Sequence, residues 1–214
     1  MDLKVNLFDL DRTLIHKNLS FGFYFFLLQE GIVPLATLLR TIPLYFRHQF
    51  KSLSLENLHH IVFKHILKGQ KLHILHEAAD RFVAPFIEKT LNRVVFKQFL
   101  DAKNARQPTY LLSSSAHFLV ERAAQLLGFD RCIGTQYSVD NEGRLCHIST
   151  LITGPVKLEI AKRWTDAGAY TTAYSDSSDD LPLLQWADKP IAVRPDKVLR
   201  AIARQNGWII LESQ

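Results

Sequence analysis

Short apolar runs, separated by longer amphipathic stretches, set the pattern of this chain. The first run, Val5 to Phe8, has the continuous apolar character of a strand that is buried on both faces of a parallel sheet. Four later runs share this character and alternate with segments of helical periodicity, at 109–112, 169–174, 191–193 and 208–211. Strands that alternate with helices predict an α/β fold with a Rossmann-like parallel sheet as its core.

The segment between the first two strands differs, because its apolar residues recur at helical spacing. One apolar stripe begins after Ser54, a suitable N-cap, and ends before Gly69. A second stripe follows from Leu72, and Pro85 predicts a kink or an end of that helix. The segment shows no strand pattern. We therefore predict that residues 1–15 and 91–214 form the α/β core and that residues 16–90 form an inserted, all-helical cap.

Three further elements are predicted in the second half of the chain. A helix should run from about His117 to Leu127, with Gly128 as its C-terminal signal. The stretch 140–143 reads as the turn of a β-hairpin. Pro155 suits the first turn of a helix that opens at Gly154.

The most apolar part of the predicted cap lies at its start. Leu19–Leu28 is almost wholly apolar, and a second run extends from Ile32 to Phe46. Glu30, Arg40 and the prolines interrupt these runs, whereas a membrane-spanning helix needs about 20 consecutive apolar residues. The pattern therefore predicts helices that either pack in the cap or lie against a membrane surface.

Composition and charge narrow the possible environments and partners. The 214 residues are 47% hydrophobic and carry a formal net charge of +5, which favours an anionic substrate or surface. Residues 40–106 hold 12 Lys and Arg against 5 Asp and Glu, as a solvated helical face or a lipid-facing surface would. Cys132 and Cys146 form no disulfide framework and lack metal-site spacing, which predicts a reduced, cytoplasmic setting.

Acidic residues directly follow two of the predicted strands. Asp9 and Asp11 come after the first strand, and Asp176 begins an acidic loop after the strand at 169–174. The ligand crevice of an open α/β sheet lies at the carboxyl ends of its strands. Carboxylates gathered there repel one another and call for a cation, for which Mg²⁺ with its preference for oxygen ligands is the expected choice.

Two other polar features are expected near the same edge of the sheet. The serines 113–115 stand between a strand and a helix, which predicts either a phosphate-binding site or a capping turn. Lys157 lies near the start of the helix that opens at Gly154, either as a surface side chain or as a ligand of an anion.

In this order and spacing the motifs resemble the four-motif set of the haloacid dehalogenase superfamily. The matching elements are Asp9-x-Asp11-x-Thr13, then Ser113, Lys157 and Tyr174-Ser175-Asp176-Ser177-x-x-Asp180. The helical insertion resembles the cap of the phosphoserine-phosphatase-like branch, subfamily IB. The ending Ile191-Ala192-Val193-Arg194-Pro195, with Gly207-Trp208, resembles bacterial members of that branch, so the likeness covers essentially the whole chain.

The resemblance implies hydrolysis of a phosphate monoester through an aspartyl-phosphate intermediate. Asp9 would be the nucleophile, Asp11 the general acid and base, and Lys157 the cation that stabilises the transition state. The cofactor Mg²⁺ would be held by Asp9, Asp11, Asp176 and Asp180. The substrate phosphate would be bound by Thr13, Ser113, Ser114, Lys157 and Asp179.

Two positions depart from the pattern of the phosphoserine phosphatases. A glutamate of those enzymes that recognises the substrate amine is replaced by Asn18, and an asparagine that contacts phosphate is replaced by Asp179. The extra charge at Asp179 would repel phosphate. Phosphoserine is therefore not the substrate that we expect first.

We predict a cytoplasmic, Mg²⁺-dependent phosphatase that acts on a small metabolite phosphate. The alternative is a phosphatidylglycerophosphatase-like enzyme acting on an anionic lipid phosphate, with its cap peripheral to the inner membrane through the apolar runs and Arg40, Arg47 and Lys51. A third class, a catalytically inactive binding protein with the same fold, is disfavoured because the catalytic set is complete. No nucleic-acid partner is expected.

Overall fold

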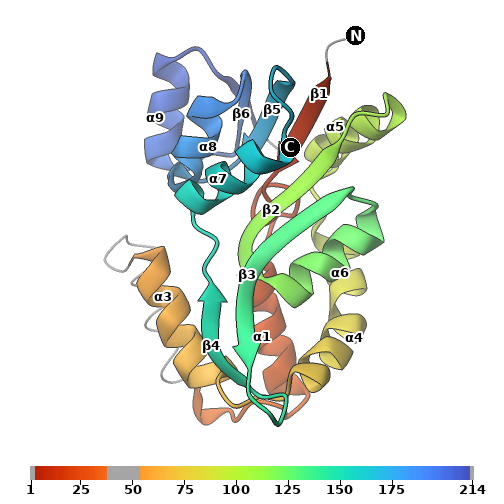
Figure 1. The fold of residues 1–214 in the computed structure, drawn as a ribbon, viewed down its shortest axis with the longest axis vertical. Coiled ribbons are helices and arrows are strands. Elements are labelled where there is room, and N and C mark those ends of the chain that lie inside the picture. The colour runs from red at the N-terminus through yellow and green to blue at the C-terminus, as the bar shows by residue number, and fades with distance from the viewer. Residues whose placement is uncertain (1–2, 38–53, 213–214) are drawn as a thin grey trace.

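The computed structural model describes residues 3–37 and 54–212, and its central feature is a seven-stranded sheet (Figure 1). The strand order is β4-β3-β2-β1-β5-β6-β7, and all neighbours pair in parallel except β3 and β4. The strands are β1 (Lys4–Phe8), β2 (Thr109–Ala116), β3 (Arg131–Val139), β4 (Leu145–Thr150), β5 (Tyr170–Ser175), β6 (Lys189–Val193) and β7 (Ile209–Leu211). The predicted α/β class with a parallel core is confirmed.

The first strand of the chain lies in the middle of this sheet. Asn6 of β1 is in register with Thr109 of β2 on one side and with Thr172 of β5 on the other. Successive side chains of β1 enter different cores, because Leu7 belongs to one apolar cluster and Phe8 to the other. A strand covered on both faces needs a continuous apolar run, which explains the pattern at its position in the sequence.

Helices cover both faces of the sheet (Figure 1). The helices α7 (Gly154–Trp164), α8 (Leu181–Trp186) and α9 (Lys197–Gln205) contribute Ile160, Leu183 and Leu199 to the cluster that contains Leu7. The helices α5 (Arg93–Asn104) and α6 (His117–Leu127) contribute Phe99 and Leu119 to the cluster that contains Phe8. This second cluster continues without a break into the helices of the insertion.

The insertion after β1 is helical where the structure describes it. Its elements are α1 (Leu19–Gln29), α3 (Leu55–Val62), the single π-helical turn η1 (Phe63–Leu67) and α4 (Leu72–Thr90). Ser54 caps α3 by accepting a bond from the Asn57 amide, as its sequence pattern indicates. A kink or an end of the helix was predicted at Pro85, and the end is wrong, because α4 continues to Thr90. Its neighbours Phe82, Val83 and Ile87 are buried and keep that turn packed.

The hairpin formed by β3 and β4 packs against the helices of the insertion. Near its start β3 pairs with β2, and further along it pairs with β4 beside the helices (Figure 1). The Leu145 amide donates to the Gln70 carbonyl at 2.9 Å, and the Tyr137 ring stacks on Phe63 at 5.5 Å. The helices of the insertion therefore pack against strands that come 40 or more residues later. The boundaries predicted for the cap stay a prediction.

The strand β2 is longer than its apolar run. The serines 113–115 were expected in a loop, but they lie inside β2, which extends to Ala116 with a shift of register after Leu112. The strand can continue because Ala116 still pairs with Thr135 of β3 and because the hydroxyls of Ser113 and Ser115 find partners. The predicted helix then follows at His117 without a loop.

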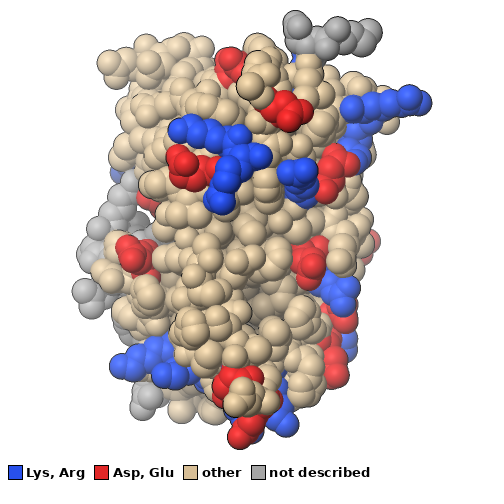
Figure 2. All heavy atoms as spheres, in the orientation of Figure 1, with Lys and Arg blue, Asp and Glu red and all other residues tan. Residues whose placement is uncertain are grey.

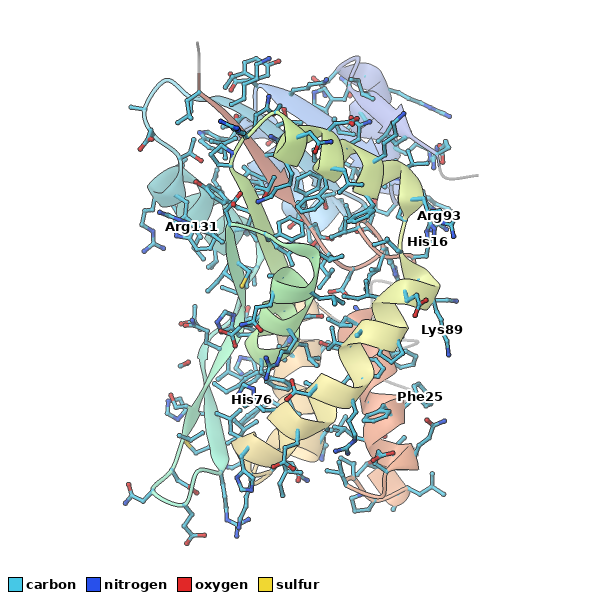
Figure 3. All side chains as sticks on the ribbon, turned by 90° about the vertical axis from the view of Figure 1, so that its right-hand side faces the viewer. His16, Phe25, His76, Lys89, Arg93 and Arg131 are labelled. Carbon is cyan, nitrogen blue, oxygen red and sulfur yellow. The ribbon has the colours of Figure 1, made fainter. Side chains whose placement is uncertain are left out.

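The apolar start of the insertion is largely buried. Leu19, Phe23 and Leu27 of α1 enter the core, whereas Phe25 remains 37% exposed on the outer side of the helix (Figure 3). Within residues 3–37 and 54–212, no helix is both long enough and apolar enough to cross a membrane.

The predicted membrane contact stays a prediction. Its basic residues Arg40, Arg47 and Lys51 lie outside the residues that the structure describes, as does most of the second apolar run. On the face in Figure 2, basic and acidic residues lie close to one another.

Candidate active site

The polar residues predicted from the sequence meet at the carboxyl ends of three neighbouring strands. Asp9 directly follows β1, Asp176 directly follows β5, and Ser113 lies in β2 on the other side of β1. The Asp9 amide donates to the Tyr174 carbonyl at 3.0 Å, which extends the pairing of β1 and β5 to the site itself. The parallel order β2-β1-β5 therefore positions these side chains.

Lys157 is buried between two carboxylates. Its Nζ lies 2.7 Å from Asp9 Oδ1 and 2.8 Å from Asp180 Oδ2, and the three residues are 4%, 6% and 3% exposed. The surface alternative for this lysine is therefore wrong. A buried ammonium needs such partners, because a charge removed from water without compensation is costly.

A glycine lets the helix of Lys157 approach the acidic loop. Gly154 is the first residue of α7, and a Cβ at this position would overlap the carbonyl oxygen of Asp179. Pro155 follows in the first turn, where its missing N–H costs no helical hydrogen bond. One turn into the helix, Lys157 then reaches Asp9.

The carboxylate of Asp11 is held by three donors. It accepts bonds from the Leu19 amide at 2.5 Å, from the Ser115 hydroxyl at 2.7 Å and from the Ser113 hydroxyl at 3.0 Å. The Ser20 hydroxyl in turn donates to Ser115 at 2.8 Å. Because Leu19 and Ser20 begin α1, Asp11 joins the start of the insertion to the core strand β2.

The turn after Asp11 has an unusual backbone. Arg12 has a φ of 61°, in the left-handed region that residues other than glycine rarely adopt. The following Thr13 is fully buried, and its hydroxyl lies 3.5 Å from Asp176 Oδ1. Asn92 holds this turn by donating to the Thr13 carbonyl at 3.0 Å. A residue with such a backbone, held in place by its surroundings, is typical of a functional site.

The acidic loop after β5 is fixed by hydroxyl groups and by a distant carboxylate. Asp180 Oδ2 accepts a bond from the Ser175 hydroxyl at 2.7 Å in addition to its ion pair with Lys157. Asp196 accepts bonds from both the amide and the hydroxyl of Ser178, at 3.0 and 2.7 Å. Asp179 is exposed. Asp176 and Asp179 of this loop thus line the cavity of the site, whereas Asp180 holds Lys157.

Burial shapes the acidity of these groups. It raises the pKa of Asp9 to about 7, although the Lys157 ammonium opposes this shift. Burial also raises the pKa of Asp11, and burial together with the nearby Asp9 carboxylate raises that of Asp176. For Lys157, burial lowers the pKa, but Asp180 and Asp9 outweigh it and raise the pKa overall. Carboxylates in such surroundings favour a bound cation.

The donor atoms fit a hard divalent cation. Within the described parts of the chain, no group of three His, Cys, Asp or Glu side chains is arranged to hold a metal. Mg²⁺, however, commonly binds through one or two carboxylates and keeps several waters. Asp9 and Asp176 could supply two carboxylates, since each lies close enough to the other for their repulsion to raise the pKa of Asp176.

The site opens into a cavity of about 220 Å³. Ser114, Lys157 and Asp179, three of the predicted phosphate ligands, line it, whereas the fully buried Thr13 and Ser113 are not among its lining residues. Sequence reasoning missed the bond from Ser115 to Asp11, and it missed Asn92, which holds the Thr13 turn. Asn92 also caps α5, and its place before a helix was the one signal for it in the sequence.

Comparisons with known proteins agree with this fold and these motifs. The family profile of haloacid dehalogenase-like hydrolases matches residues 7–185. A histidinol-phosphatase from Neisseria meningitidis serogroup C is 27% identical over 96% of both chains. A protein of unknown function from Bordetella pertussis Tohama I superposes with a TM-score of 0.84 at 23% identity over 99% of both chains. A phosphoserine phosphatase solved as a phospho-aspartyl intermediate analogue has a TM-score of 0.68 at 18% identity, over 100% of this chain and 95% of that one.

Proposed function

The chain belongs to the haloacid dehalogenase-like hydrolase family, and on this premise we propose that it hydrolyses a phosphate monoester through a phosphorylated Asp9. The observation that carries the proposal is the buried contact of the Lys157 ammonium with Asp9 and Asp180. Such a cation beside a carboxylate lowers the repulsion that an incoming phosphate dianion would meet. The structure of the phosphoserine phosphatase with a phospho-aspartyl analogue supports the same chemistry by likeness of fold.

In the first step Asp9 attacks phosphorus and Asp11 protonates the leaving group. An oxygen of the Asp9 carboxylate forms a bond to phosphorus while the bond from phosphorus to the ester oxygen breaks. Asp11 donates a proton to that oxygen, which leaves as the alcohol. The hydroxyls of Ser113 and Ser115 fix the orientation of the Asp11 carboxyl group for this transfer.

In the second step Asp11 acts as a base. It accepts a proton from a water molecule, whose oxygen attacks the phosphorus bound to Asp9. The bond between Asp9 and phosphorus breaks, inorganic phosphate leaves, and the Asp9 carboxylate is restored. Lys157 stays beside Asp9 throughout, where it offsets negative charge on the transferring group.

We propose that Mg²⁺ is the cofactor of this site. Asp9, Asp176 and the backbone carbonyl of Asp11 would hold the ion, and Asp180 would keep Lys157 in place. When bound, Mg²⁺ neutralises charge on the nucleophile and on the phosphate group. Of the predicted phosphate ligands, Ser114 and Lys157 line the cavity and are the ones that we favour.

Replacing Asp9 tests the proposal. We expect Asp9→Asn to fold and to lose at least ~10³-fold in turnover of p-nitrophenyl phosphate, about 4 kcal/mol of barrier. Asp166→Asn changes an exposed aspartate outside the site in the same way and should keep normal turnover. Intact-mass measurement after rapid acid quench should show one added phosphoryl group on the wild type alone. Near-normal turnover by Asp9→Asn would exclude the mechanism.

The same assay addresses the alternative of a catalytically inactive binding protein. Wild-type protein that binds phosphate but turns over no monoester, with or without Mg²⁺, would support that alternative. Loss of turnover after chelation, and its return on adding Mg²⁺, would support the cofactor assignment.

A further inference from the structure

The cavity at Asp9 extends away from the carboxylates into a space with apolar walls. We call this part the apolar chamber and define it by Phe21 and Tyr24 of α1, Leu58 of α3, Ile66 of η1, Phe118 of α6 and Tyr137 of β3. Its walls therefore come from the insertion, from the core helix after β2 and from the hairpin. A group attached to phosphate at Asp9 would extend into it.

The charged residues of the cavity lie at one end. Among its described lining residues, the Asp, Lys and Arg side chains all follow β1 or β5 or belong to the first turn of α7. Of the described lining residues on the side of the insertion, the one titratable group besides tyrosine is His59, which carries no negative charge. Among the residues that the structure describes, the chamber thus has no carboxylate that could bind a positively charged substrate group.

The sequence between the two described parts of the insertion adds no acidic residue. The stretch 38–53 contains Arg40, Arg47, His48 and Lys51 but no aspartate or glutamate. Asn18, which also lines the cavity, is uncharged, and its carbonyl oxygen already accepts a bond from the Phe21 amide at 2.8 Å. Glu30 of the insertion is paired with Arg81 at 2.9 Å. An ammonium group in the chamber would therefore be desolvated without a counter-charge, which is costly.

We propose that the substrate is the monoester of an uncharged, largely apolar alcohol, whose organic part occupies the apolar chamber. This inference rests on the proposed function and specifies its substrate class. The whole cavity, which would hold the phosphate group as well as the organic part, measures about 220 Å³, whereas an apolar cavity of about 150 Å³ holds benzene. The class excludes amino-alcohol phosphates, including phosphoserine and histidinol phosphate, as preferred substrates.

A series of unbranched alkyl phosphates tests the inference. With Mg²⁺ present, kcat/KM should rise about fourfold for each added methylene, or ~0.8 kcal/mol, and should level off once the chamber is filled. Phosphoserine, phosphoethanolamine and histidinol phosphate should be turned over more slowly than butyl phosphate. Equal kcat/KM for ethyl and octyl phosphate, or preference for an ammonium ester, would overturn the inference.

A substitution in the wall of the apolar chamber, compared with the same substitution at an exposed position, tests where the organic group lies. Leu58→Glu places a carboxylate in the chamber and should reduce the ratio of kcat/KM for octyl phosphate to that for ethyl phosphate by at least about tenfold. Leu35→Glu makes the same change at a residue that is 71% exposed and does not line the cavity, and it should keep the wild-type ratio. An unchanged ratio in Leu58→Glu would show that the organic group lies elsewhere.

Two further measurements separate the possible causes of failure. Octylphosphonate, which binds without being hydrolysed, should raise the Tm more than methylphosphonate, and an equal shift would count against the chamber independently of turnover. If no monoester is hydrolysed, p-nitrophenyl phosphate included, the proposed function itself fails. Lysophosphatidic acid in neutral vesicles identifies the source of the ester: faster turnover than octyl phosphate assigns a membrane lipid, and slower turnover assigns a soluble ester.

Discussion

Gly154 determines how closely α7 approaches the acidic loop after β5. Because a Cβ would overlap the Asp179 carbonyl oxygen, Gly154→Ala should push the helix or the loop aside and displace Lys157 from Asp9. A displacement of about 1 Å in a catalytic group can cost about 10²-fold in rate, and we expect a loss of that order in kcat/KM. Pro155→Ala, at the exposed neighbouring position, should have little effect. Equal activity of the two variants would contradict this role.

Ser115 is a positioning residue for Asp11. Removing its hydroxyl in Ser115→Ala deletes the 2.7 Å bond to Asp11 and should disturb proton transfer more than binding. The expected result is a fall of about tenfold in kcat with a larger loss for alkyl phosphates than for p-nitrophenyl phosphate, whose leaving group needs no acid. A purely structural role predicts equal losses for both esters and a lowered Tm.

Single residues show which parts of the site the sequence could predict. Asp9 and Asp176 follow apolar runs that become β1 and β5, so their convergence follows from the parallel sheet. The contact of Ser115 with Asp11 was not predictable, because it depends on a register shift in β2. The roles assigned to these residues stay predictions until variants are assayed.

Two strands begin with the same arrangement of hydrogen bonds. Asp130 accepts bonds from the amide and hydroxyl of Thr109 at the start of β2, and Asp188 does the same for Thr171 in β5. The bonds from Thr171 lower the pKa of Asp188. For Asp130 burial acts in the opposite direction, but Lys103 and Thr109 outweigh it and lower the pKa. Each carboxylate directly precedes the neighbouring strand of the sheet, β3 or β6, and so ties the start of that strand to the start of β2 or β5.

Because folding lowers these two pKa values, the stability that the two aspartates contribute to the fold should decrease as the pH falls. A group whose pKa is lowered by folding stabilises the fold above its ordinary pKa of about 3.9, and this contribution is lost as the pH falls through the folded value. Asp188→Ala should therefore lower the Tm by about 2–4 °C at pH 7 and by progressively less as the pH falls below about 3.9. Asp166→Ala serves as the exposed control. A pH-independent loss in Asp188→Ala would point to packing as the cause.

Element lengths were harder to predict than element types. The apolar run at 109–112 predicted a strand, but β2 extends through three serines because a neighbouring strand and internal hydroxyl bonds satisfy them. Likewise α4 passes through Pro85, since burial of Phe82 and Ile87 outweighs the local preference. Tertiary contacts decided both cases, and they are not visible in local sequence.

For the whole molecule, the main expected response is to Mg²⁺. A ligand that binds only the folded protein stabilises it by about 2.7 kcal/mol at a hundredfold excess over its Kd. We expect Mg²⁺ to raise the Tm of chelator-treated protein and Asp176→Ala to remove that rise, while Asp166→Ala keeps it. A Tm that does not respond to Mg²⁺ in the wild type would contradict the proposed cofactor.

For the whole molecule, the sequence was most informative about the fold class and the enzyme class. The α/β fold was predicted from the alternation of strand and helix patterns and is confirmed. The superfamily and the enzyme class, a phosphatase of the haloacid dehalogenase type, were predicted from four spaced motifs and are also confirmed. The apolar chamber was not predicted, because the hairpin side chain Tyr137 and the insertion side chain Phe21 meet only in three dimensions. Periodicity identifies a buried face but not the cavity between two such faces.

The central position of β1 also bears on how the chain folds during synthesis. Its partners β2 and β5 begin at Thr109 and Tyr170, so the apolar strand at Lys4–Phe8 emerges from the ribosome long before either. At 5–20 residues per second, β5 follows roughly 10–30 s later. Fragments that stop before Tyr170 should therefore aggregate, and the nascent chain should depend on chaperones that hold its N-terminal strand until β5 has been synthesised.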